Sequence, residues 1–111
     1  MFSLVEILRY QCSDGSVPFD DWLTHVRSDR ARARMAIRVR RLSMGIWGDA
    51  RSVGHGVVEL REDEGAGYRL YVGRHGPAVV VLLCGGGGKR TQQKDIVRAY
   101  HFWADWKKRN S

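Results

Sequence analysis

Hydrophobic and polar positions alternate along the chain with two different periods. In four segments the apolar residues either occupy every second position or fill a continuous run, and both patterns are typical of β-strands. These segments are residues 2–10, 57–61, 68–74 and 78–84. In three others apolar residues recur every three or four positions, as on one face of a helix; these are residues 19–27, from 28 or 29 to 44, and from 91 or 94 to 108. Residues 13–18 and the glycine-rich segment 45–56 are expected to be loops.

The predicted elements follow one another as strand, helix, helix, three strands, helix. The connections 62–67 and 75–77 are short and rich in turn residues, so the three consecutive strands are expected to form an antiparallel meander. Residues 79–83 are apolar on both faces, which is typical of a central, covered strand. We therefore expect a single α+β domain over residues 1–111, with two layers: two N-terminal helices and a C-terminal helix packed on a small, mainly antiparallel sheet.

Composition and charge narrow the possible partners. Hydrophobic residues make up 43% of the chain and charged residues 28%, as in an ordinary folded domain. Nineteen Lys and Arg against twelve Asp and Glu give a formal charge of +7, which favours a polyanionic partner or an acidic protein. The longest apolar run is far shorter than a membrane span, and no secretory leader is recognisable, so a cytoplasmic protein without a membrane partner is expected. Cys12 and Cys84 are expected to be reduced and inert.

The charged residues along one side of the second predicted helix are all arginines. Arg30, Arg34, Arg38 and Arg41 form a stripe beside an apolar face made by Ala31, Met35, Val39 and Leu42. One interpretation is an ordinary solvated face. The other is a surface for phosphate or carboxylate groups, because solvated faces normally mix charges of both signs.

Strand alternation predicts a second polar patch. If Val58 and Leu60 point into the core, Glu59 and Arg61 point outward, and the same argument on the next strand turns Arg69 and Tyr71 outward. These four side chains are then expected on one solvent-facing patch. It could be a functional site, a set of cross-strand salt bridges, or both.

The segment 84–91 places four glycines, Lys89 and Arg90 between a buried strand and a helix. It departs from a Walker loop at Leu83 and Arg90, so it is either an anion site or a flexible linker. The four histidines have no metal-ligand spacing, so no metal is expected. His55 and His75 are either proton carriers or surface residues in turns. No covalent-nucleophile motif is present.

Several short segments together resemble the HigB-like, phage-derived addiction-module killer proteins of the RelE/ParE toxin superfamily. They occur in the right order over nearly the whole chain: Phe19-Asp-Asp-Trp-Leu23, Ala31-Arg-Ala-Arg34, Gly45-Ile-Trp-Gly-Asp49, Gly56-Val-Val-Glu-Leu-Arg61, Gly67-Tyr-Arg-Leu-Tyr71, Leu82-Leu-Cys-Gly-Gly86, Lys89, Gln92, Asp95-Ile96 and Ala99.

The resemblance implies a RelE-like fold and the toxin of a type II toxin–antitoxin pair. RelE-type relatives cut mRNA in the ribosomal A site, where the ribose 2′-hydroxyl attacks the adjacent phosphate without a metal or cofactor. Arg69 and Arg90 match the two arginines of that pattern, and Lys89 lies beside the second. The expected phosphate-binding residues are Arg30, Arg34, Arg38, Arg41 and Arg61.

The chain also departs from the RelE pattern. Val57 and Glu59 stand where RelE-type toxins carry lysines, and their C-terminal tyrosine aligns near Ile96. Proton transfer would then fall to Glu59, Tyr71 or a histidine. The open alternatives are a ParE-like inhibitor of DNA gyrase that cuts no RNA and a basic nucleic-acid-binding accessory protein. The implied partners are the ribosome with its mRNA and a helix-turn-helix antitoxin. Operator DNA would be contacted only through the antitoxin.

Overall fold

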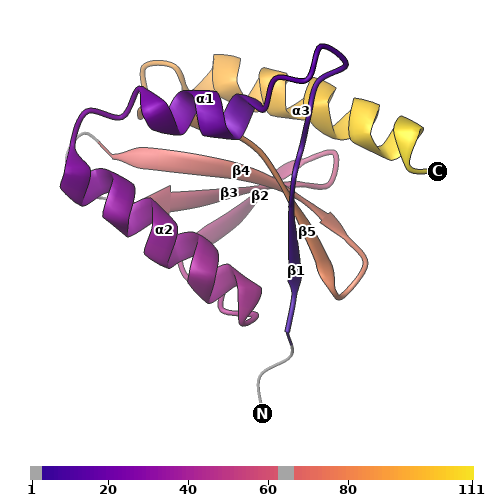
Figure 1. Cartoon of the computed structure of the whole chain (residues 1–111), viewed down its shortest axis with the longest axis horizontal. Coiled ribbons are helices and arrows are strands. Elements are labelled where there is room, and N and C mark those ends of the chain that lie inside the picture. The colour runs from indigo at the N-terminus through magenta and orange to yellow at the C-terminus, as the bar shows by residue number, and fades with distance from the viewer. Residues whose placement is uncertain (1–3, 63–66) are drawn as a thin grey trace.

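The protein is described by a computed structural model that covers residues 4–62 and 67–111. Its elements are β1 (Glu6–Arg9), α1 (Pro18–Thr24), α2 (Asp29–Ser43), β2 (Ala50–Gly54), β3 (Val57–Glu62), β4 (Tyr68–His75), β5 (Val79–Gly86) and α3 (Gln92–Arg109) (Figure 1). The α+β class is confirmed. The predicted order lacked one strand, β2, which lies in the segment expected to be a loop.

The five strands form one mixed sheet in the order β1-β5-β4-β3-β2. The meander of β3, β4 and β5 is antiparallel as predicted, and β5 is the covered strand. β1 pairs in parallel with β5, in the register Glu6 with Val79. The expected first strand began at residue 2, but residues 2 and 3 lie outside the described part of the chain, as does most of the expected turn 62–67.

β2 joins β3 through a two-residue hairpin. His55 and Gly56 form the turn, with φ of 56° and 82°, and Gly54 before them has φ of 97°. Paired left-handed residues are what a tight hairpin requires, and glycine adopts them without strain. The same glycines made this segment look like a loop, because glycine is uncommon in strands.

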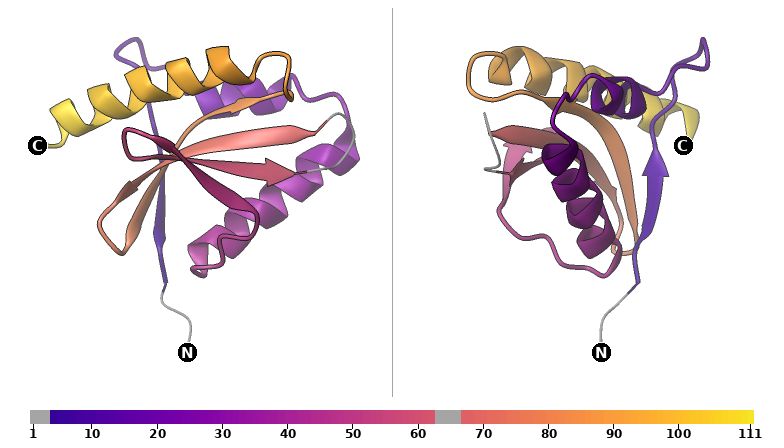
Figure 2. Two further views of the ribbon diagram at one scale, coloured as in Figure 1. Left: turned by 180° about the vertical axis from the view of Figure 1, so that it is seen from behind. Right: turned by 60° about the vertical axis from the view of Figure 1, so that its left-hand side comes forward.

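Helices cover both faces of the sheet, so the predicted two layers are in fact three. One apolar cluster joins β3, β4 and β5 to α3 through Ile96, Ala99 and Trp103. The other joins the opposite face to Phe19 of α1 and to the predicted apolar side of α2. The views in Figure 2 show α3 along one side of the sheet and α2 along the other.

Local sequence explains where the helices begin. Pro18 opens α1, and two aspartates in its first turn favour the positive end of the helix. Ser28 caps α2, since its hydroxyl accepts a hydrogen bond of 3.1 Å from the backbone N–H of Ala31. α1 ends at Thr24, three residues before the predicted end, and α2 is followed by Gly45 with φ of 79°.

Candidate functional site

Glu59 is the centre of a buried polar cluster on the α3 face of the sheet. Its side chain and that of Tyr71 are both 0% exposed, and Arg69 is 5% exposed. The predicted solvent-facing patch is therefore wrong for these three residues. They do share one face, as alternation predicted, but α3 covers that face.

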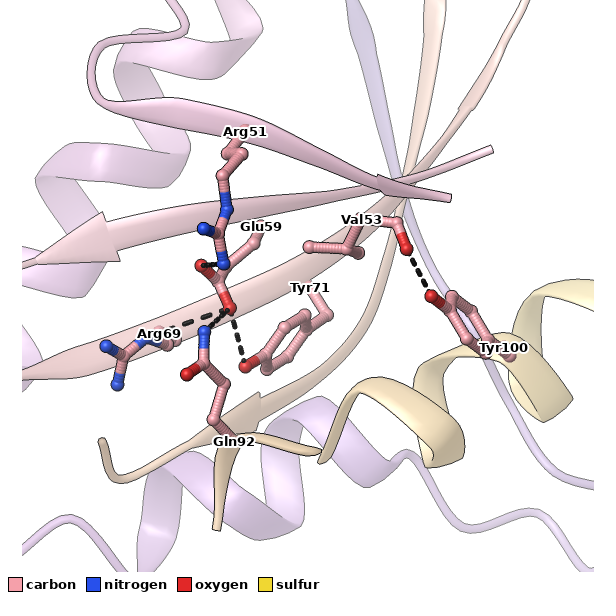
Figure 3. Close-up of polar contacts among 7 residues, drawn as sticks. All are labelled: Arg51, Val53, Glu59, Arg69, Tyr71, Gln92 and Tyr100. Atoms are coloured by element: carbon pink, nitrogen blue, oxygen red, sulfur yellow. Dashed lines mark hydrogen bonds and ion pairs between the residues drawn. The ribbon is translucent and has the colours of Figure 1, made fainter. Parts of the chain in front are cut away.

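The Glu59 carboxylate contacts four side chains from three elements, β2, β4 and α3 (Figure 3). Its Oε2 accepts hydrogen bonds from the Tyr71 hydroxyl at 3.1 Å and the Gln92 amide at 2.9 Å. Nε of Arg69 lies 3.7 Å from the same oxygen, and Nη2 of Arg51 lies 3.3 Å from Oε1. The cross-strand ion pair that we considered from the sequence is thus present, but its carboxylate is buried and contacts two arginines rather than one.

Tyr71 is a hydrogen-bond donor in this cluster. Burial raises the pKa of its hydroxyl well above the usual value, and the Glu59 carboxylate raises that pKa further. The hydroxyl therefore keeps its proton at neutral pH. Since neither Tyr71 nor Glu59 has an exposed atom, neither is placed to exchange a proton directly with a large substrate.

Arg69 has donor groups that are not satisfied within the described part of the chain. Its Nε and Nη1 atoms are buried and have no hydrogen-bond acceptor there. Buried donors without acceptors are costly, and in native structures each one calls for an explanation such as an ordered water, an ion or a catalytic role. Arg61 pairs with Arg69 across β3 and β4 and therefore shares its face, and it is partly exposed.

Sequence reasoning missed two members of the cluster, Arg51 and Gln92. Arg51 lies on β2, which was expected to be a loop, and its register partner is Glu59. Gln92 is the first residue of α3, at the end of the helix that lies over β3 and β4. A hairpin assignment around His55-Gly56 would have revealed Arg51, because the turn fixes the register.

In the first half of the glycine-rich segment 84–91, the glycines allow close packing and do not form a flexible linker. Gly85 and Gly86 belong to β5, and a Cβ on either would overlap Trp22 or Asp95 respectively. Asp95 lies in the first turn of α3 and accepts a 2.8 Å hydrogen bond from Thr91. Its carboxylate thus occupies the position near the helix N-terminus that a phosphate would favour.

Lys89 and Arg90 are exposed in the connection between β5 and α3. Because Gly86 pairs with Arg69, this connection begins at the same end of the sheet as the buried cluster. An anion site here stays a prediction. It would rest on the two basic side chains and not on a cradle of glycine N–H groups.

Arg38 does not belong to an exposed arginine stripe. It is 8% exposed, and its guanidinium donates to the backbone oxygens of Arg61, Trp47 and Asp49. It therefore holds the loop before β2 against the end of β3. The assignment of Arg38 to phosphate binding is wrong for this structural reason, since these donors are used.

The other three arginines of the predicted stripe face outward from α2. Arg30, Arg34 and Arg41 are exposed. Arg34 lies 3.9 Å from the carboxylate of Glu62, which also contacts Arg38 at 3.7 Å. Glu62, the last residue of β3, thus neutralises part of the stripe.

The histidines and cysteines take ordinary structural places. His55 and His75 are exposed residues of hairpins, with their rings against Tyr100 and Trp106. Both cysteines are free, and burial raises the pKa of Cys84 to about 12. Among the described residues no three His, Cys, Asp or Glu side chains lie together in a way that could hold a metal ion.

No helix in the described part of the chain has the length and apolar character that spanning a membrane requires. No protein-family model matches the sequence. The chain is 46% identical over 84 residues to an uncharacterized protein of Haemophilus influenzae, a match that covers 76% of this chain and 84% of the relative. The chain therefore belongs to the same protein family as this Haemophilus influenzae protein.

Proposed function

We propose that the protein is the toxin of a type II toxin–antitoxin pair, a RelE-like ribonuclease that cuts mRNA on the ribosome. The observation that carries the proposal is Arg69, a buried arginine on a central strand, held beside Glu59, with two donor nitrogens that have no hydrogen-bond acceptor among the described residues. The formal charge of +7 and the exposed basic residues at the same end of the sheet support it.

The proposed chemistry needs positive charge at the scissile phosphate. The ribose 2′-hydroxyl gives up its proton and attacks the neighbouring phosphorus, and the bond from phosphorus to the 5′-oxygen of the next nucleotide breaks. That oxygen leaves with a proton, a 2′,3′-cyclic phosphate remains, and negative charge grows on the phosphate oxygens in the transition state. The positive charge of the Arg69 guanidinium, which is fixed beside Glu59, stabilises that negative charge without having to reorganise. Arg90 adds a second cation from the connection before α3.

Proton transfer falls to exposed groups rather than to Glu59 and Tyr71. Both of those residues are buried, and the Glu59 oxygens already accept hydrogen bonds from Arg51, Tyr71 and Gln92 and form an ion pair with Arg69. Among the residues expected at the site, Lys89 is exposed and can reach the proton-bearing groups of a substrate.

A cytoplasmic toxin of this kind requires a partner that blocks it in its own cell. We propose a helix-turn-helix antitoxin whose contact surface is acidic, matching the net positive charge of this chain. Co-expression with the neighbouring gene, followed by size exclusion at low salt, tests this partnership. Separate elution with persistent toxicity contradicts it.

The ribonuclease activity is tested by primer extension on two copies of one message, of which only one is translated. After induction we expect cleavage of the translated copy alone. Equal cleavage of both copies indicates a free ribonuclease. Intact messages with arrested gyrase support the ParE-like alternative instead.

A further inference from the structure

Glu59 lies between two arginines and holds both. Arg51 reaches Oε1 from β2, and Arg69 reaches Oε2 from β4, as Figure 3 shows. One carboxylate between two guanidinium groups leaves a net positive charge in the cluster. Tyr71 and Gln92 also donate to Oε2 and fix the orientation of the carboxylate.

Arg51 is the solvent-accessible member of the cluster. Its side chain is 59% exposed, whereas that of Arg69 is 7% exposed and that of Glu59 is 0% exposed. The ion pair uses one of its nitrogens, Nη2, so that other N–H groups of the planar guanidinium remain available. An anion that approaches from solvent therefore contacts Arg51 first. The positive charge of Arg69, which is buried behind Arg51, also attracts it.

The strand that carries Arg51 is held in place although it is at the edge of the sheet. β2 pairs with β3 in the register Arg51 with Glu59. The hydroxyl of Tyr100, from α3, donates to the backbone oxygen of Val53 on the same strand (Figure 3). The Arg51 guanidinium is thus oriented by the strand and by a buried carboxylate, which reduces the cost of ordering it on binding.

We infer that Arg51 and Arg69, fixed side by side by Glu59, form an oxyanion site that takes a phosphodiester group of RNA. In this site Arg51 contacts the phosphate, and Glu59 is a positioning residue rather than a proton carrier. The assignment of RNA as ligand rests on the proposed function. An arginine fork matches two phosphate oxygens at once, which a lysine cannot do.

The chain offers a closely matched control in Arg9. Its side chain is 60% exposed and contacts the carboxylate of Asp20 at 3.1 Å, so it resembles Arg51 in exposure and in having an acidic partner. It lies on β1, at the opposite edge of the sheet from β2. Arg9→Ala and Arg51→Ala therefore remove the same charge at two distant places.

The test measures binding of the full-length protein to a fully 2′-O-methylated RNA oligonucleotide, which cannot be cleaved, at several salt concentrations. We expect Arg51→Ala to weaken binding about tenfold or more and to lower the salt slope by about one unit. Arg51→Lys should recover the salt slope but not the affinity. Arg9→Ala should bind as the unchanged protein does.

Equal affinities of Arg51→Ala and Arg9→Ala would overturn the inference, as would Arg51-dependent binding of an oligoglutamate peptide but not of the RNA. The unchanged protein must itself bind the oligonucleotide, and failure to do so also overturns it. Primer extension separates the two proposals. If mRNA is not cut but RNA binding depends on Arg51, the Arg51 site stands and the ribonuclease proposal fails. If both variants cut mRNA equally and bind RNA equally, the ribonuclease proposal stands and the Arg51 site fails.

Discussion

The indole of Trp103 lies directly on Gly73, so that a Cβ at this position of β4 would overlap the ring. α3 can approach the sheet closely here because the strand has no side chain. Gly73→Ala is therefore expected to lower the free energy of unfolding by about 1–3 kcal/mol, since the helix or the ring must move. Urea unfolding followed by circular dichroism measures this.

Gly87 is the matched control for that substitution. Nothing lies within 4 Å of a Cβ at Gly87, and its φ is not in the left-handed region. Gly87→Ala is expected to change the free energy of unfolding by less than about 1 kcal/mol. A loss as large as that of Gly73→Ala would show that the contact with Trp103 is not the cause.

A second prediction separates two arginines of α2. Arg38→Ala removes the donors to three backbone oxygens and is expected to lower the free energy of unfolding by roughly 2–4 kcal/mol. Arg41→Ala, at an exposed position, should leave stability unchanged and weaken RNA binding, because it removes a surface charge. Thermal unfolding and salt-dependent binding distinguish the two; equal stabilities would contradict the role given to Arg38.

A third prediction concerns Arg69. If it stabilises the charge that develops on the phosphate, Arg69→Ala should slow mRNA cleavage by roughly 10²–10³ while binding to ribosomes stays largely intact. Quantitative primer extension and co-sedimentation with ribosomes give the two values. Weaker binding with an unchanged rate of cleavage in the bound state would remove its catalytic assignment.

The raised pKa of Tyr71 predicts how stability changes with pH. The unfolded chain releases this phenol proton near the ordinary pKa of 10.0, whereas the folded chain retains it. Above that pH the unfolded state binds fewer protons, so stability falls as pH rises, by up to about 1.4 kcal/mol per pH unit for this one group.

Tyr71→Phe tests that prediction. The variant lacks the titrating hydroxyl, so its free energy of unfolding should fall less steeply above pH 10 than that of the unchanged protein. At pH 7 the same variant should be less stable by about 1–2 kcal/mol, because it loses the hydrogen bond to Glu59. Parallel pH curves for both proteins would contradict the assignment.

Much of the fold could be predicted because the elements have clear periodicity. The apolar face of α2 and the apolar residues of β5 were identified from spacing alone, and all of them are buried except Val39 and Val79, which are partly buried. β2 could not be identified in this way. Its pairing depends on left-handed residues in the hairpin at His55 and Gly56, and a run rich in glycine carries no alternating pattern to read.

The burial of the candidate site was missed for a different reason. Alternation correctly put Glu59 and Tyr71 on one face of the sheet and Leu60 and Leu70 on the other. It cannot say that both faces are covered, because a polar residue with buried partners looks like an exposed one in sequence. Only the placement of α3 over β3 and β4, which brings Gln92 to Glu59, shows this.

The parallel pairing of β1 with β5 has a consequence for synthesis of the chain. Glu6 is made long before its register partner Val79, so β1 cannot join the sheet until β5 has been made. Closing so large a loop is entropically costly and slows folding. The residues around Glu59 wait longer still, since Gln92 is made after β5. A nascent chain that stops before α3 thus lacks the helix that covers this face of the sheet and the hydrogen bond from Gln92 that helps to orient the Glu59 carboxylate.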